Sequence, residues 1–197
     1  MATILWQRLD VPGHEAARLD EVAGTGAALA GTASFAYQGL ACCLRYRILL
    51  DGEWRTRSAA VDGFLGEREV RVELTVTGGR WILDGVAQPA VDGCLDLDLN
   101  FSPSTNLLPI RRLALAVGDE APVRAAWLRF PSFALEPLEQ TYRRLDAHLY
   151  RYSSAGGSFV RDLPVDAAGF VTEYPDYWRA EPGARPQSGL AGREPAC

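Results

Sequence analysis

Two aspartates at alternate positions, Asp96 and Asp98, are the residues of this chain whose type and spacing could support catalysis. They lie in CLDLDLNFSPSTNLLPIRRL, residues 94–113, where leucines alternate with polar residues as in a β-strand. On a strand both side chains would point to one face, about 7 Å apart. Two carboxyl groups at roughly this separation can act as acid and base, so one alternative is a hydrolase acting on a sugar or ester.

A polar segment, residues 102–109, follows the aspartates and is typical of a turn. Proline disfavours the helical conformation of the residue before it, so Pro109 predicts that Leu108 is not helical. The segment is longer than a minimal hairpin connection and rich in specific polar residues. We therefore expect it to have a defined structural or binding role.

Two arginines come directly after this turn, which would bring their guanidinium groups back toward the carboxylates. Structural ion pairs are a commoner use of such residues than catalysis, so we favour Asp96 and Asp98 as partners of arginines. We expect Asn106, Arg111 and Arg112 to form either the rim of a ligand groove or a structural lock.

The sequence contains no motif for a calcium, transition-metal or phosphate site. An EF-hand loop needs glycine and glutamate where this chain has Phe101 and Leu107. His14 and His148 are not in a metal-ligand spacing, and the glycine doublets precede strand patterns rather than the helix of a phosphate loop. We expect no metal or other cofactor, and a binding protein rather than an enzyme.

The amino-acid composition limits the classes of binding partner and the cellular compartment that we expect. The formal net charge of -5 argues against nucleic acid as the main partner, and all 20 cationic side chains are arginines, which suit forked recognition of anions. The four cysteines form no C-x-x-C motif and two are adjacent, which is typical of a reducing compartment. With no signal peptide or membrane-spanning segment in the pattern, we expect a cytoplasmic protein, monomeric or dimeric.

Alternation with a period of two recurs along the chain, with turn signals between the runs. Residues 14–19 could instead form a short helical turn, and residues 138–152 read as one continuing strand that contains His148. Strands spaced 8 to 12 residues apart predict an all-β barrel, half-barrel or sandwich. The turn signals are Asp51-Gly52, Asp62-Gly63, Gly78-Gly79, Asp84-Gly85 and Gly156-Gly157.

Aromatic residues on these strands, beside arginines, could hold an amphipathic ligand between apolar walls and a charged rim. Arg55 and Arg57 would share a face with Arg45 and Arg47 if the two runs paired as a simple hairpin. Four clustered cations would need anions nearby.

Five segments carry a resemblance to a known family: WQRLDVPGHE, YRILLDGEWRTRSAAV, GCLDLDLNFSPSTNLLPIRRL, AAWLRFPSFALEPLEQTYRR and GFVTEYPDYWRAE. Over residues 4–181 the chain resembles the bacterial glycolipid-binding family, formerly a domain of unknown function. The resemblance implies one strongly curved antiparallel sheet, an open half-barrel like those of lipoprotein carriers. Its concave groove would hold a glycolipid or other amphipathic ligand.

The resemblance implies a single half-barrel domain at residues 1–181, and the proline- and glycine-rich tail at residues 182–197 is expected to be disordered. A β-sheet scaffold for a protein partner is a further alternative. The residues that match the family's segments and could line a ligand site are Trp54, Arg55, Arg57, Asp96, Asp98, Asn106, Arg111, Arg112, Trp127 and Tyr142.

Overall fold

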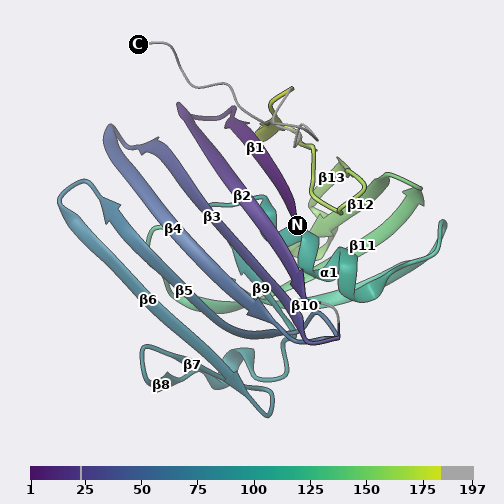
Figure 1. Ribbon diagram of the computed structural model, residues 1–197, viewed down its shortest axis with the longest axis horizontal. Helices are drawn as coiled ribbons and strands as arrows, with labels where there is room; N and C mark the ends of the chain where they lie inside the picture. The colour runs from purple at the N-terminus through teal and green to yellow at the C-terminus, as the bar shows by residue number, and fades with distance from the viewer. Residues whose placement is uncertain (23, 183–197) are drawn as a thin grey trace, which may run out of the picture.

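The computed structural model describes residues 1–22 and 24–182. Most of the long strands form one curved, antiparallel ten-stranded sheet (Figure 1). In sheet order its strands are β14 (Glu173–Tyr174), β15 (Trp178–Ala180), β1 (Ala2–Arg8), β2 (Gly13–Val22), β3 (Gly26–Tyr37), β4 (Leu40–Leu50), β5 (Thr56–Leu65), β6 (Arg68–Thr77), β7 (Arg80–Leu83) and β8 (Val86–Ala87).

A second sheet of five strands passes behind the first and extends beyond it on one side (Figure 1). Its strands in order are β13 (Phe159–Pro164), β12 (Leu149–Ser154), β11 (Leu135–Asp146), β10 (Glu120–Leu128) and β9 (Asp96–Leu99). β9 and β10 pair in parallel, and the other pairs are antiparallel. The helical elements are η1 (Pro89–Val91), η2 (Ser104–Asn106), α1 (Leu107–Leu113) and η3 (Ala155–Gly157). Among the described residues, no helix is long and apolar enough to span a bilayer.

The predicted open, curved all-β fold is confirmed, and it follows from strand alternation. On β4, for example, Leu44, Tyr46 and Ile48 are buried while Arg45 and Arg47 are exposed, because successive side chains point to opposite faces. The inward face of the large sheet packs against apolar residues of β9, β10 and α1. Most of its concave side is therefore protein core rather than an open groove.

The helical alternative for residues 14–19 is wrong, because this segment belongs to β2. Its backbone pairs on both sides, with β1 through Trp6 opposite Glu15 and with β3 through Leu19 opposite Leu29. Two flanking strands satisfy its backbone groups and bury its inward side chains. Tertiary pairing thus overrides a local pattern that was ambiguous.

The predicted turn at Asp62 and Gly63 is also wrong, since both residues lie within β5. Gly63 has a φ of 148°, and a Cβ there would lie 1.9 Å from the Cys43 carbonyl oxygen. Glycine is required by this close approach of β4 rather than by a turn. Asp62 faces Arg45 across the strand pair and forms an ion pair with it. The predicted hairpins at residues 78–79, 84–85 and 156–157 are confirmed.

Leu108 is helical, contrary to the prediction from Pro109. α1 begins at Leu107, so Pro109 lies in its first turn, where backbone N–H groups have no acceptor within the helix. Proline costs no hydrogen bond there, and Leu107 and Leu108 are fully buried.

His148 lies in the turn between β11 and β12 rather than on a strand, and it is exposed. The expected disordered tail lies outside the described residues, except for residue 182.

Candidate functional site

A pocket with a volume of about 560 Å³ lies between one end of the concave face and the five-stranded sheet. We call it the inter-sheet pocket. Its wall on the large sheet includes Arg8 from β1, Tyr37 from β3 and Trp178 from β15. Trp127 from β10 and Tyr152 from β12 line the opposite side. The volume falls within the range of small-molecule sites in proteins.

Four aromatic rings from the C-terminal part of the chain form a continuous wall of this pocket. Tyr152 and Phe159 have centroids 6.0 Å apart, Phe159 and Tyr177 are 6.3 Å apart, and Tyr174 and Tyr177 are 5.7 Å apart. The sequence predicted aromatic residues beside a ligand, but not which of them converge. Their convergence depends on β12, β13 and β14 meeting from different sheets.

A second aromatic group surrounds Phe130, which also lines the pocket. The centroid of Phe130 lies 4.8 Å from Tyr37, 5.4 Å from Phe35 and 6.3 Å from Phe101. Phe130 is held in place through its backbone N–H, which donates to Asn100 Oδ1 at 3.1 Å. This end of the pocket therefore offers apolar contact.

Arg8 is the cationic side chain that lines the pocket, and its Nε and Nη2 are already engaged, whereas its buried Nη1 has no hydrogen-bond partner among the described residues. Its Nε lies 2.7 Å from Asp10 Oδ1, and its Nη2 lies 3.0 Å from Asp10 Oδ2. The guanidinium carbon lies 4.3 Å from the Phe35 centroid and 5.2 Å from the Trp178 centroid. Arg8 thus combines a bidentate ion pair with cation–π contacts on the pocket wall.

Asp98 is a carboxylate of the pocket lining that has a neutral partner. Gln140 Nε2 donates to Asp98 Oδ2 at 2.6 Å. Burial raises the pKa of Asp98 to about 6, the Gln140 bond opposes this shift, and the charge of Asp96 adds to it. Asp98 therefore does not form the predicted ion pair with an arginine.

Asp96, two residues earlier, does form the predicted ion pair. Its side chain is 1% exposed, and Arg112 holds both carboxylate oxygens, with Nε 2.9 Å from Oδ1 and Nη2 2.6 Å from Oδ2. Asp96 is absent from the lining of the inter-sheet pocket, so the two aspartates do not share a cavity. The hydrolase alternative through Asp96 and Asp98 consequently has no support.

Asn106 lies in the pocket lining and also makes structural hydrogen bonds. Its side chain ties the turn to β11, because Tyr142 Oη donates to Asn106 Oδ1 at 2.8 Å. Asn106 Nδ2 in turn donates to the Pro103 carbonyl oxygen at 3.1 Å. Tyr142 is 1% exposed, so it supports Asn106 from behind the pocket wall.

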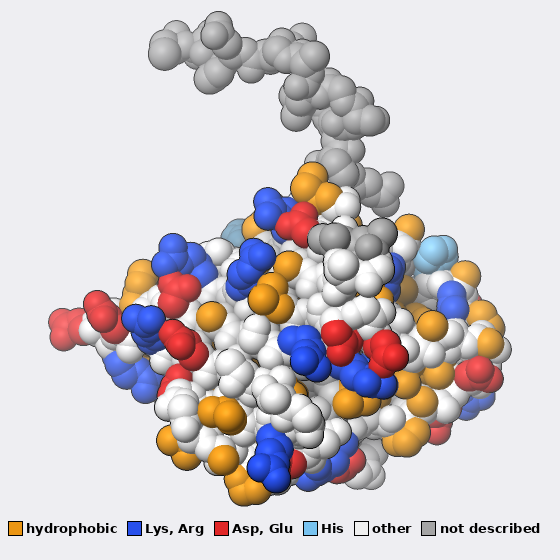
Figure 2. All heavy atoms as spheres, turned by 60° about the horizontal axis from the view of Figure 1, so that its bottom comes forward, with side chains coloured by type: hydrophobic (Ala, Val, Ile, Leu, Met, Phe, Trp, Pro, Cys, Tyr) orange, Lys and Arg blue, Asp and Glu red, His pale blue; other side chains and the backbone are white. Residues whose placement is uncertain are grey.

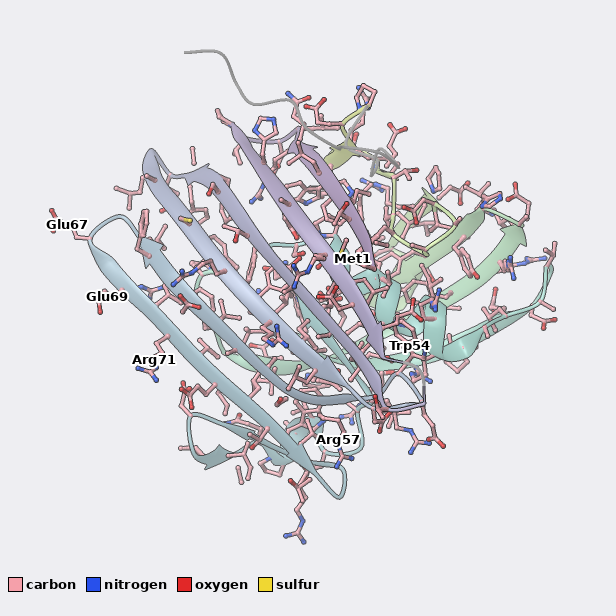
Figure 3. The ribbon with its side chains drawn as sticks, in the orientation of Figure 1. Met1, Trp54, Arg57, Glu67, Glu69 and Arg71 are labelled. Carbon is pink, nitrogen blue, oxygen red and sulfur yellow. The ribbon has the colours of Figure 1, made fainter. Side chains whose placement is uncertain are left out.

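The remaining predicted residues lie away from the pocket. Trp54 is in the turn after β4, and the Arg111 guanidinium lies 4.5 Å from its ring centroid while pairing with Glu21 at 2.8 Å. Arg55 shares that turn and Arg57 lies at the start of β5. In the β4–β5 register Arg45 is opposite Asp62 and Arg47 is opposite Ala60, so the arginines of the two runs do not face one another. Figure 3 shows Trp54 near α1 and Arg57 further along the outside of the sheet.

Four of the ten predicted residues thus lie at the inter-sheet pocket or directly behind its wall. Asp98, Asn106 and Trp127 line the inter-sheet pocket, with Tyr142 behind Asn106. Whether any of the ten contacts a ligand stays a prediction. On the outer surface, cations and acids are interspersed over the face shown in Figure 2.

Sequence reasoning missed a buried polar network beside the pocket. Glu15 is fully buried, and its Oε1 accepts hydrogen bonds from Tyr46 Oη and Ser102 Oγ, each at 2.6 Å. Ser104 Oγ lies 2.7 Å from Tyr46 Oη. Burial raises the pKa of Glu15 to about 7, against the opposing effect of these hydrogen bonds and of the Arg8 charge. Recognising β2 as a strand would have placed Glu15 on the inward face.

Together, the fold and the pocket define an open, curved β-sheet protein with a partly open pocket lined by aromatic residues. The sequence profile of the family described as "Putative glycolipid-binding" matches residues 3–180, and the chain belongs to this family. The resemblance inferred from the sequence is confirmed.

A solved structure supports the same assignment. The crystal structure of a DUF1089 family protein from Pseudomonas aeruginosa is 38% identical to this chain, with a TM-score of 0.73. The match covers 84% of this chain and 90% of that one. A search of curated proteins gave no match.

Proposed function

We propose that this protein binds a glycolipid or other amphipathic small molecule in the inter-sheet pocket. The observation that carries the proposal is the pocket itself, a cavity of about 560 Å³ with aromatic walls and a few polar groups. The family's description points in the same direction. In this proposal the protein binds its ligand rather than transforming it.

The distribution of side chains supports an amphipathic ligand in particular. The apolar part would contact Phe130, Tyr37 and Leu138, while the polar part would reach Asp98 and Asn106. Large aromatic surfaces supply most of the contact energy in such pockets, and a small number of polar groups fix the orientation. A ligand of this kind would use both parts of the lining at once.

Native mass spectrometry of the protein purified from cells tests the proposal directly. We expect a co-purifying molecule with an apolar chain, released on denaturation. A Trp127→Ala variant removes an aromatic wall and should lower the occupancy or affinity about tenfold or more, which corresponds to about 1.4 kcal/mol. The matched control is Arg57→Ala, on the outside of the sheet, which should leave binding unchanged. Equal effects of the two variants would contradict the proposed pocket.

We further propose a cytoplasmic location. Cys42, Cys43 and Cys94 are free thiols, and this is the state expected in a reducing compartment. Fractionation of cells that express the tagged full chain tests this, and recovery from an oxidising compartment would contradict it.

A further inference from the structure

The carboxylate of Asp98 is a negative charge, largely withdrawn from solvent, without a cationic partner. Its hydrogen-bond donor is the neutral amide of Gln140, at 2.6 Å. Within the described part of the chain, Asp98 forms no ion pair, whereas Asp96 on the same strand is held by Arg112. A carboxylate removed from water is costly unless it is paired or coordinated. The free protein therefore leaves a favourable interaction at Asp98 unmade.

The rings around Asp98 have the character of a cation site. Asp98 and Tyr152 line the same pocket, and burial and then the charge of Asp98 raise the pKa of Tyr152. Tyr152, Phe159 and Tyr174 line the same cavity, with Tyr152 and Tyr174 centroids 6.3 Å apart. Aromatic faces attract cations, and quaternary ammonium groups are commonly bound between such rings.

The charges of the pocket lining disfavour an anionic ligand group. Three charged side chains line it, and Arg8 is neutralised by Asp10 at 2.7 Å, which leaves Asp98 as the uncompensated charge. An anion placed near Asp98 would be repelled, and a neutral sugar hydroxyl could donate a hydrogen bond without balancing the charge. A cation would gain both the ion pair and the ring contacts.

We propose that the polar end of the ligand carries a positively charged nitrogen, a primary or quaternary ammonium, which lies beside Asp98 against the rings of Tyr152 and Tyr174. This inference rests on the proposed function and specifies the chemistry of the ligand's head. The apolar chain of the same molecule then extends toward Phe130. An amine-bearing lipid or an amino-sugar lipid has this combination of groups.

Three single-chain probes of equal length distinguish the possible heads: decyltrimethylammonium, decyl glucoside and decyl sulfate. Binding to the full chain is measured by calorimetry or tryptophan fluorescence, below the concentration at which each probe aggregates. We expect the ammonium probe to bind at least tenfold more tightly than the other two. In Asp98→Asn this preference should fall to within about threefold, because the nearly isosteric amide removes the charge and keeps the shape.

Asp62→Asn is the matched control, since it removes one negative charge from β5 on the outer face and leaves the pocket intact. It should keep the full preference for ammonium. Circular dichroism and a thermal melt establish that both variants fold.

The outcomes separate this inference from the proposed function. If the glucoside or the sulfate binds as tightly as the ammonium probe, or if Asp98→Asn keeps the ammonium preference, the cationic head is wrong while the amphipathic pocket stands. If none of the three probes binds and no lipid co-purifies, the proposed function fails, and the inference fails with it.

Discussion

The hydroxyl of Ser102 donates a hydrogen bond of 2.6 Å to Oε1 of Glu15, which lies 87 positions earlier in the chain. Glu15 is on β2 in the concave face, and Ser102 lines the inter-sheet pocket. Tyr46 on β4 donates to the same oxygen. These bonds join two strands of the large sheet to the segment that precedes η2, and so fix the floor of the pocket.

Glu15 should make stability depend on pH. Its pKa is about 7 in the folded protein and 4.5 as the reference value, so the folded state binds more protons between these limits. Stability therefore falls as the pH rises from 4.5 through about 7, by roughly 3 kcal/mol at full extent. Denaturant unfolding of wild type and Glu15→Gln at pH 5 and pH 8 measures this. The variant should lose less stability than wild type, and equal losses would contradict the assignment.

Breaking the ion pair between Asp96 and Arg112 should be strongly destabilising. Arg112→Met leaves the Asp96 carboxylate, which is 1% exposed, without its partner, and we expect a loss of about 3–5 kcal/mol. The double variant with Asp96→Asn should recover much of this loss. Arg45→Met, which removes the exposed partner of Asp62, should cost less than about 1 kcal/mol. Chemical denaturation measures the unfolding free energy of each variant. Similar losses for Arg112→Met and Arg45→Met would contradict the stated difference between the buried and the exposed ion pair.

Gly63 should tolerate no side chain. In Gly63→Ala the new Cβ would lie 1.9 Å from the Cys43 carbonyl oxygen, so β4 and β5 must separate locally. We expect a loss of several kcal/mol in a thermal melt or insoluble protein. Gly78, in the hairpin after β6, has a positive φ, but a Cβ added there would meet no atom within 4 Å, so Gly78→Ala should cost only about 1–2 kcal/mol. A mild effect at Gly63 would contradict the close approach.

Tyr142→Phe should loosen the turn that carries Asn106. The change removes a hydroxyl that donates to Asn106 Oδ1 at 2.8 Å and leaves that oxygen short of a partner, so we expect a loss of about 1–3 kcal/mol. Tyr37→Phe is the control, because the Tyr37 hydroxyl accepts only a long, exposed hydrogen bond of 3.4 Å from Gln38 among the bonds seen in the described residues. Its unfolding free energy should change by less than about 0.5 kcal/mol. Equal changes would show that the Asn106 bond contributes little.

Several local features of the fold could be predicted because their causes are local. The alternation of Leu44, Tyr46 and Ile48 with arginines reflects the two-residue period of a strand, and Gly78-Gly79 forms the hairpin that such a doublet favours. The helical alternative for residues 14–19 and the turn predicted at Gly63 are wrong for the opposite reason. Strand pairing in one case and a close backbone approach in the other depend on neighbours distant in sequence.

For the site, the sequence by itself determined that Asp96 and Asp98 share one side of a strand and that arginines follow. Only the tertiary structure decided that Arg112 reaches Asp96, while Asp98 meets Gln140 and opens to a cavity. It also decided that Glu15 is buried beneath that cavity. The physical reason is the same throughout: side-chain periodicity is set within a few residues, whereas burial, charge pairing and the pocket arise from strands brought together across the whole chain.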